Sequence, residues 1–387
     1  MLSVFRLARK ARSGAIALVA LLALAACDPL APGVSLNNRN AVPVALLVPT
    51  SAPDGGAALA QSFENAARLA MTDLAGAEID LRVYDTFGQP AGATNATNQA
   101  IADGARIILG PLFAESASAA GAAAAPRGVN VLSFSNNPAV AGGNVFLLGR
   151  TFQNTADRLV RYAALQGRTD IVIVNAESPA EQAGRDAIAR AIAVNGVRLA
   201  GNTSFALNQQ AVIEAVPIIA EQVEASGADT VFLTSGNDGA VPFLAELLPE
   251  NGVDPAEIQL IGLQRLDIPS GALALDGLQG ALFAVPDPGL DAQFRARYEA
   301  AFGAVPHPLA SLAYDGIAAI GALSSTGQPN ALSAQTLTRP AGFAGVGGVF
   351  RFLPNGTNER GLAVARVQDK QVVFVDPAPR SFGGTGF

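Results

Sequence analysis

Residues 42–71 read VPVALLVPTSAPDGGAALAQSFENAARLAM, and this stretch decides the type of fold. Val42–Val48 is a continuous apolar run of strand length, which is typical of a parallel strand buried on both faces. From Gly56 to Leu74 apolar residues recur at three- and four-residue spacing, which predicts an amphipathic helix. The stretch therefore predicts one strand–loop–helix unit of an α/β protein.

The same alternation continues along the chain and predicts a parallel sheet with helices on both faces. The first series has further strands predicted at 79–84, 106–109 and 130–133, and helices at 89–103 and 114–125. A second series follows Arg150, with strands at 170–174, 198–205, 230–233, 259–262 and 279–284, and helices at 153–166, 180–195, 209–226, 240–248, 290–302 and 309–323. Short apolar runs at 346–352, 361–367 and 371–375, the first two separated by Pro354-Asn355-Gly356, predict a C-terminal antiparallel β meander.

Two such series predict two lobes that face a cleft. We expect residues 42–149 plus 287–330 to form lobe 1, residues 150–286 plus 340–376 to form lobe 2, and residues 377–387 to form a flexible tail. Ligands of open α/β sheets bind beyond the carboxyl ends of the strands, so the loops at those ends are candidate binding segments.

The composition of the 387-residue chain excludes many enzyme classes. It has one cysteine (Cys27), one histidine (His307) and two lysines, and neither lysine lies in a phosphate-binding loop motif. The 25 basic residues against 32 acidic ones predict no nucleic-acid surface. We expect no enzyme activity, no cofactor and no metal site.

The N-terminus is typical of an export signal. Four basic residues up to Arg12 precede an apolar run, 15–26, that is too short to span a bilayer and fits a signal peptide. The run ends Leu24-Ala25-Ala26-Cys27, which resembles a bacterial lipobox. We expect residues 1–26 to be a lipoprotein signal peptide, Cys27 to carry lipid and residues 27–40 to be a tether; an ordinary signal peptide is the alternative.

Several longer phrases resemble leucine-binding-type (type 1) periplasmic binding proteins. These are the opening stretch quoted above, GARIILGPLFAESASAAGAAAAPRGVNVLSFSNNP, FLLGRTFQNTADRLVRYAALQG and SLAYDGIAAIGAL, in that order. The resemblance covers about Val42 to Pro377 and implies a two-lobed fold with three crossovers. Within that group, ILGPLF, VLSFSN and GVFRFLPNGTNERGLAVARV are most similar to penicillin-binding protein activators, which are envelope lipoproteins, although the added N-terminal helical-repeat domain that some of them carry is not present between Cys27 and the first strand.

The resemblance also implies where a ligand would bind. The hydroxyl that usually holds an amino-acid carboxylate aligns with Ala114, with Ser116 two residues on, and the acidic residue that receives the ammonium aligns with Gln264. A neutral Gln cannot make that charge-assisted bond, so the zwitterion clamp is incomplete unless Glu177 or Asp238 substitutes. The full set of cleft candidates is Thr50, Ser51, Asp54, Phe113, Ala114, Ser116, Ser135, Asn136, Asn137, Glu177, Asn237, Asp238 and Gln264.

Two functions follow from these observations. The first is a lipid-anchored envelope protein that regulates peptidoglycan synthesis through a class A penicillin-binding protein or related peptidoglycan machinery. The alternative is a solute-binding protein that delivers an amino acid or a related small polar ligand to an ABC permease. Both place the protein in the periplasm of a Gram-negative bacterium, held at the outer or inner membrane by its lipid.

Overall fold

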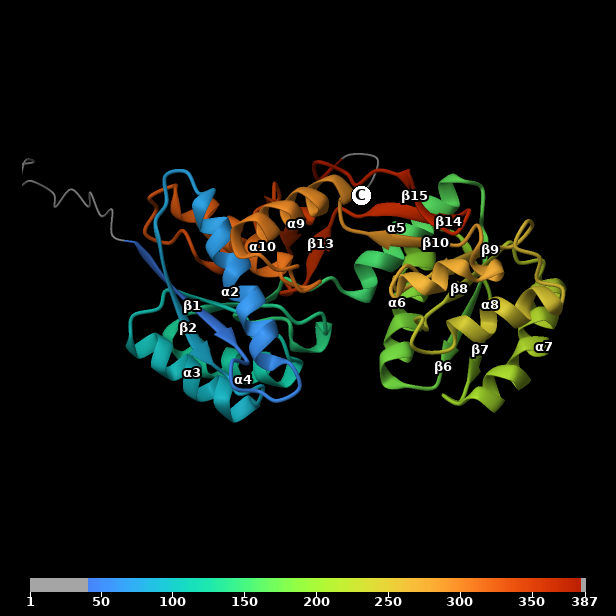
Figure 1. The fold of residues 1–387 in the computed structure, drawn as a ribbon, viewed down its shortest axis with the longest axis horizontal. Coiled ribbons are helices and arrows are strands. Elements are labelled where there is room, and N and C mark those ends of the chain that lie inside the picture. Colours follow the sequence, from blue (N-terminus) through green and yellow to red (C-terminus); the bar gives the residue numbers. More distant parts are fainter. Residues whose placement is uncertain (1–40, 384–387) are drawn as a thin grey trace, which may run out of the picture. The chain divides into compact units, whose positions relative to one another are not determined.

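The computed structural model describes residues 41–383, which form three β-sheets with flanking helices (Figure 1). The predicted signal peptide, the predicted lipidation at Cys27 and the predicted tether lie outside the described residues, as does the end of the predicted tail. The chain from Ala41 onward packs as one unit. Between residues 41 and 383, none of the helices combines the length and the apolar character that a membrane span requires.

The first large sheet is wholly parallel, as the sequence predicts. Its five strands have the order β2-β1-β3-β4-β5. They are β1 (Val42–Val48), β2 (Ile79–Asp85), β3 (Ile107–Leu109), β4 (Asn130–Ser133) and β5 (Val145–Leu147). The edge strand β5 was not among the predicted strands, because its three residues fall in a segment that we interpreted only as a crossover.

Strand β1 shows why its sequence is apolar without interruption. Val44, Leu46 and Val48 join one buried cluster, whereas Ala45 and Leu47 join the cluster on the opposite face. The first cluster includes helices α2 (Gly56–Thr72) and α10 (Ser311–Ser324), and the second includes α3 (Pro90–Ala102) and α4 (Ala114–Ala124). Figure 1 shows these two helix pairs on either side of β1 and β2. A strand covered on both faces has no exposed position at which a polar side chain would be favoured.

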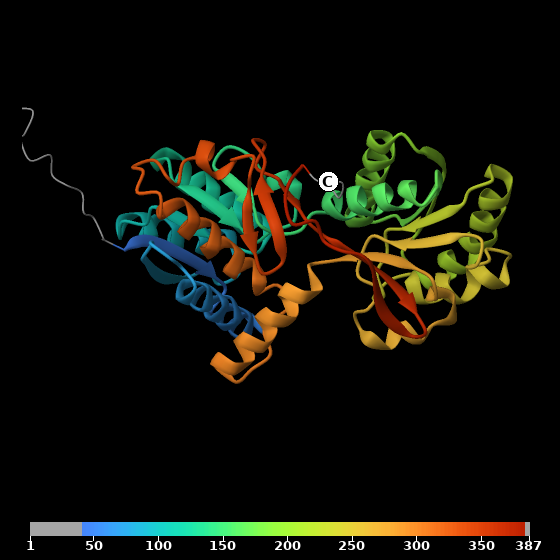
Figure 2. The same cartoon turned by 90° about the horizontal axis from the view of Figure 1, so that it is seen from above.

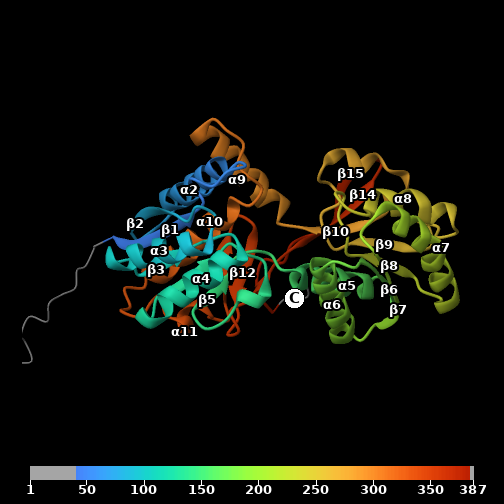
Figure 3. The same cartoon turned by 90° about the horizontal axis from the view of Figure 1, so that it is seen from below.

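The second large sheet has seven strands in the order β15-β14-β10-β9-β8-β6-β7, which can be followed in Figure 3. They are β6 (Asp170–Ala176), β7 (Arg198–Phe205), β8 (Thr230–Leu233), β9 (Gln259–Gly262), β10 (Leu282–Val285), β14 (Ala363–Gln368) and β15 (Gln371–Asp376). The five strands from β6 to β10 are mutually parallel, and β14 and β15 add to β10 in antiparallel fashion.

Helices cover both faces of this sheet as well. Helices α5 (Phe152–Leu165) and α6 (Pro179–Asn195) contribute to one buried cluster, and α7 (Gln209–Ser226) and α8 (Val241–Glu250) to the other. The remaining α-helices of the described chain are α9 (Pro288–Phe302) and α11 (Ala334–Leu337). Four short 3₁₀ helices span Ala125–Arg127, Pro138–Val140, Ser270–Ala274 and Asp276–Leu278.

The C-terminal antiparallel strands are divided between two sheets instead of forming one continuous meander. The predicted turn at Pro354 to Gly356 joins β12 (Gly348–Phe352) to β13 (Asn358–Arg360), and β12 also pairs with β11 (Phe343–Gly345) in a separate three-stranded sheet. The chain then enters β14, and Figure 2 shows the β14–β15 hairpin in red beside β10. The partner of each strand is decided by contacts distant in sequence, which a local pattern does not contain.

The division of the C-terminal strands between two sheets also concerns the predicted extent of lobe 2. The sequence predicts residues 340–376 as part of lobe 2, but Phe343, Phe350 and Phe352 lie in the buried cluster of the first sheet. Only β14 and β15 of that segment belong to the second sheet. The other lobe boundaries stay a prediction.

Candidate functional site

A cavity of about 580 Å³ is lined by segments that follow the carboxyl ends of strands in both large sheets. Phe134 and Asn136 follow β4, the segment 236–238 follows β8, and the segment 263–265 follows β9. Its volume is in the range of small-molecule sites, and its place is the one where open α/β sheets bind ligands. This cavity is the candidate functional site.

Much of the cavity wall is hydrocarbon. The apolar lining residues are Phe134, Phe152, Leu263, Ile268, Leu309, Leu312 and Leu362. Phe134 is fixed by stacking on Phe63, with ring centroids 4.3 Å apart and an interplanar angle of 10°. Ile268 and Leu309 are 51% and 40% exposed, so apolar surface remains for a ligand to cover. Burial of a ligand's hydrocarbon here would stabilise a complex by about 25 cal/mol per Å².

Two amide side chains form a polar part of the wall, and each of their nitrogens donates a hydrogen bond within the protein. Gln264 donates from Nε2 to the Thr234 carbonyl at 3.1 Å. Asn237 donates from Nδ2 to the carbonyls of Leu266 at 2.8 Å and Ile268 at 3.0 Å. The Asn237 Oδ1 atom is buried and accepts no hydrogen bond from the described residues. These amides therefore offer a ligand neutral groups only: their acceptor oxygens and the second N–H of Gln264.

Arg150 lines the cavity with a positive charge that no described carboxylate pairs. Its Nη1 atom is buried and has no hydrogen-bond partner among the described protein atoms, and no ion pair involves it within residues 41–383. Burial, followed by repulsion from the neighbouring cations Arg265 and Arg360, lowers the pKa of Arg150 to about 10, and the attraction of Asp267 acts against this lowering. The group remains cationic near neutral pH, in a place that disfavours a cation.

The other two arginines of the cavity are paired. Arg265 donates from Nε to Asp267 Oδ1 at 2.8 Å, and a second contact joins Nη2 to Oδ2. Arg360 donates from Nη1 to Asp315 Oδ2 at 2.9 Å and from Nε to the Leu148 carbonyl at 2.9 Å. Burial raises the pKa of Asp315, and the Arg360 guanidinium acts against that rise. Asp267, whose charge acts on Arg150, and Asp315, the partner of Arg360, are thus each occupied by a different arginine.

Four of the predicted cleft residues line this cavity: Asn136, Asn237, Asp238 and Gln264. Asp238 is exposed at the rim. An ideal Cβ at Gly236 would lie 2.7 Å from Asp238 Oδ1 and 2.9 Å from Gln264 Oε1, so these two oxygens flank the backbone of Gly236. These four predicted residues therefore line one cavity, and their part in ligand binding stays a prediction.

The other predicted cleft residues do not line the cavity. Three lie in the loop after β1: Thr50 and Asp54 are exposed, and the Ser51 amide donates to Asp85 Oδ1 at 3.3 Å. Phe113 and Ala114 stand at the start of α4, where Phe113 is 45% exposed. The strand order places β4 and β5 nearest the crossover at residue 150, and β1 and β3 farther from it.

The remaining four candidates have local roles or none that the contacts reveal. Ser135 Oγ accepts from the Asn137 amide at 3.2 Å, and Asn137 Oδ1 accepts from the Ala139 amide at 3.0 Å. Ser116 is buried with its Oγ unpaired, and Glu177 is exposed after β6. Participation of these residues in ligand binding stays a prediction.

Sequence reasoning missed Arg150 as a site residue. The sequence gives only a weak indication that Arg150 has a functional role. Arg150 directly precedes Thr151, the N-cap of α5, whose hydroxyl accepts a hydrogen bond from the Asn154 amide. A cation at a helix N-terminus is unfavourable with the helix dipole, so a reason other than helix stability is needed for it.

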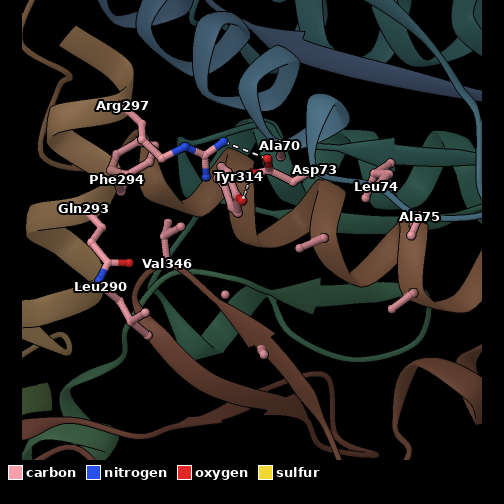
Figure 4. A pocket seen from close by; sticks show the side chains of 15 residues that line it. Ala70, Asp73, Leu74, Ala75, Leu290, Gln293, Phe294, Arg297, Tyr314 and Val346 are labelled. Atoms are coloured by element: carbon pink, nitrogen blue, oxygen red, sulfur yellow. Dashed lines mark hydrogen bonds and ion pairs between the residues drawn. The ribbon is translucent and has the colours of Figure 1, made fainter. Parts of the chain in front are cut away.

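A second pocket, of about 410 Å³, lies among α2, α9, α10 and β11 (Figure 4). Its charges are neutralised within the protein. Arg297 Nη2 lies 2.7 Å from Asp73 Oδ1, and the Tyr314 hydroxyl donates to Asp73 Oδ2, as the dashed lines in Figure 4 show. The hydrogen bond from Arg297 lowers the pKa of Asp73. This pocket offers no unpaired charge comparable with that of Arg150.

Comparison with known proteins identifies the family. A family profile described as "Periplasmic binding protein" matches residues 41–371. The chain therefore belongs to the periplasmic binding protein family, whose members are ligand-binding proteins.

Solved structures agree with this at the level of the fold. A putative branched-chain amino acid ABC transporter protein from Rhodospirillum rubrum superposes with a TM-score of 0.74 at 17% identity, covering 87% of this chain and 100% of that one. A substrate-binding protein from Desulfitobacterium hafniense in complex with Leu superposes with a TM-score of 0.63 at 18% identity, covering 86% and 99%. An uncharacterized protein from Rickettsia prowazekii is 25% identical over 121 residues, which is 31% of this chain and only 32% of that relative's length.

Proposed function

We propose that this protein is the solute-binding component of an ABC transporter and binds a small polar organic ligand in the cavity beside Arg150. The observation that carries the proposal is the cavity itself. It is large enough for an amino-acid-sized ligand, it combines a hydrocarbon wall with fixed polar groups, and it lies beyond the strand ends of both large sheets.

The comparisons favour this function over regulation of peptidoglycan synthesis. The R. rubrum protein is described as an ABC transporter protein, and the D. hafniense protein holds leucine. The resemblance to penicillin-binding protein activators rests on short sequence phrases alone. We therefore place the permease ahead of a class A penicillin-binding protein as the partner of this chain.

We further propose that the mature protein is exported to the periplasm of a Gram-negative bacterium and anchored by lipid on Cys27. The support is the basic n-region, the apolar run and the Leu-Ala-Ala-Cys sequence. Multiple acyl chains bind a bilayer firmly because each buried methylene contributes about 0.8 kcal/mol. A Cys27→Ser protein should leave the membrane fraction, and retention there would contradict lipid anchoring.

A thermal-shift screen of amino acids, organic acids and amides tests the solute-binding function. The protein is first unfolded and refolded, so that any co-purified ligand is removed. A ligand at 100 times its Kd stabilises the folded state by about 2.7 kcal/mol, which a melting curve detects. A flat response to the whole panel would contradict the proposal.

A matched pair of variants assigns any response to this cavity. Asn136→Trp places a bulky ring in the cavity, and Gln293→Trp places the same ring in the second pocket; both native residues are exposed, so both chains should fold. We expect only Asn136→Trp to abolish the shift. In parallel, capture of class A penicillin-binding proteins together with a change in their glycan-synthesis rate would favour the regulatory function instead.

A further inference from the structure

We propose that the ligand is an organic monoanion, anchored by its acid group on Arg150 and lacking an ammonium group. This inference rests on the proposed solute-binding function and specifies the chemical class of the ligand. It also moves the expected carboxylate anchor away from Ala114 and Ser116, which do not line the cavity, to an arginine that the family resemblance did not suggest.

No described protein group balances the charge of Arg150. A buried guanidinium normally has a carboxylate or carbonyl partner, because an unpaired buried charge is strongly destabilising. Arg150 Nη1 has no partner among the described atoms, although it lines a cavity large enough for a small molecule. A planar guanidinium binds a carboxylate through two parallel hydrogen bonds, so it is suited to hold the acid group of a ligand.

Asp267, the acid whose charge acts on Arg150, and Asp315, which pairs with the neighbouring cation Arg360, are not free to neutralise Arg150. Asp267 makes two contacts with Arg265, and Asp315 accepts from Arg360 and from the Val346 amide. Arg265 and Arg360 are each paired with an acid, so the charge of Arg150, the third arginine that lines the cavity, is left without a counterion among the described residues. A ligand with one net negative charge would balance it.

The opposite end of the ligand would meet neutral groups. The position expected to receive an ammonium is Gln264, which is neutral, and its neighbour Asn237 presents a neutral Oδ1. The one lining acid without an ion pair in the described chain, Asp238, is exposed to solvent, where its attraction for a cation is weakened by screening. The cavity thus offers the unpaired positive charge of Arg150 but, among the described residues that line it, no buried negative charge to match it, which favours an acid over a zwitterion.

A titration series with three compounds of one shape tests the ligand class: 4-methylpentanoate, 4-methylpentanamide and leucine. The acid has the carboxylate alone, the amide has neither charge, and leucine has both. We expect the acid to bind about tenfold to a hundredfold more tightly than the amide, as loss of a charge-assisted hydrogen bond implies. Calorimetry of refolded, ligand-free protein measures the three values of Kd.

Each pattern of binding decides one point. If the amide binds as tightly as the acid, Arg150 is not an anion anchor and the inference is overturned. Leucine binding at least as tightly as the acid overturns the monoanion class, and loss of that binding in Asp238→Asn would identify the ammonium partner. Both of those results leave solute binding intact, whereas failure of every compound in the broader screen would overturn the proposed function itself.

Variants of Arg150 supply a readout that does not depend on having the right ligand. Arg150→Met removes the unpaired charge and keeps a long side chain, so the ligand-free protein should unfold at a higher temperature than the wild type. The same change should weaken binding of the acid about tenfold or more, and Arg150→Lys should restore part of it. Arg297→Met, which breaks the paired Arg297–Asp73 contact outside the cavity, should lower stability and leave binding unchanged. If Arg150→Met instead lowers the melting temperature of the ligand-free protein, Arg150 is already paired and the inference fails.

Discussion

Arg360 and Asp315 form a buried ion pair, with 2.9 Å between Nη1 and Oδ2 and side-chain exposures of 7% and 1%. The pair joins β13 to α10, and Arg360 also donates from Nη2 to the Leu148 carbonyl at 2.5 Å, next to the crossover. The Val346 amide donates to the same carboxylate at 2.9 Å. One short network therefore holds together three segments that are far apart in the sequence.

Loss of Asp315 should be strongly destabilising. Asp315→Ala leaves the Arg360 charge buried without its partner, and breaking a buried pair on one side typically costs about 3–5 kcal/mol of unfolding free energy. Urea unfolding followed by circular dichroism measures the change. The control is Glu64→Gln, which removes the partner of Arg68 in an i,i+4 pair whose arginine is 48% exposed, and should cost less than about 1 kcal/mol. A similar small effect in both variants would show that the buried network does not stabilise the fold.

Tyr314 should make the protein less stable at alkaline pH. Burial, followed by the hydrogen bond to Asp73, raises the pKa of Tyr314 to about 12. Because this pKa is higher in the folded than in the unfolded chain, its contribution to stability is complete below about pH 10 and is lost as the pH rises toward 12. Urea unfolding at several pH values between 8 and 11.5 should show this decline.

Tyr314→Phe is the matched control for the alkaline effect. It removes the ionisable hydroxyl and keeps the ring that packs edge-on against Phe294, with centroids 5.9 Å apart. The variant should lose the part of the pH dependence that arises from this one group. An unchanged slope between pH 10 and 11.5 would assign the alkaline effect to other residues.

The N-cap of α5 should contribute a further measurable amount. The Thr151 hydroxyl accepts from the Asn154 amide at 3.3 Å while Asn154 Oδ1 accepts from the Thr151 amide at 2.9 Å, which is a reciprocal capping box. Thr151→Ala should lower the unfolding free energy by about 1 kcal/mol, and Thr151→Ser should retain most of it. Equal losses in the two variants would show that the methyl group, and not the cap, is responsible.

Particular elements show how much of the fold could be predicted from the sequence. The run Val42–Val48 predicts a doubly covered strand because each of its two side-chain faces must be apolar, and the structure confirms this for Val44 and Ala45 on opposite faces. The sequence could not predict that β12 and β14 pair in different sheets, because both are short apolar strands with the same local pattern. Only contacts distant in sequence, such as Phe350 with the first core and Ala365 with the second, distinguish them.

The residues of the candidate site could be predicted from the sequence only in part. Polar residues after β8 and β9 could be predicted as cavity residues, because the rule of strand ends needs only the order of the elements. Arg150 could not, because its proposed role depends on the absence of a counterion among the described residues. Asp267, whose charge acts on Arg150, is held by Arg265, and the neighbouring cation Arg360 is paired with Asp315 across 45 residues of sequence.

Gly236 provides a test of the polar wall that leaves every functional group in place. A Cβ at this position would lie within 3 Å of Asp238 Oδ1 and Gln264 Oε1, so Gly236→Ala must displace both oxygens. We expect the variant to fold, because these are the ends of side chains, and to bind the acid and leucine probes with altered relative affinities. Gly239→Ala is the matched control, since its nearest neighbouring atom would lie at 3.6 Å, an ordinary contact. Calorimetry of both variants decides the point: unchanged affinities in Gly236→Ala, with the fold intact, would mean that the oxygens beside Gly236 do not touch the ligand.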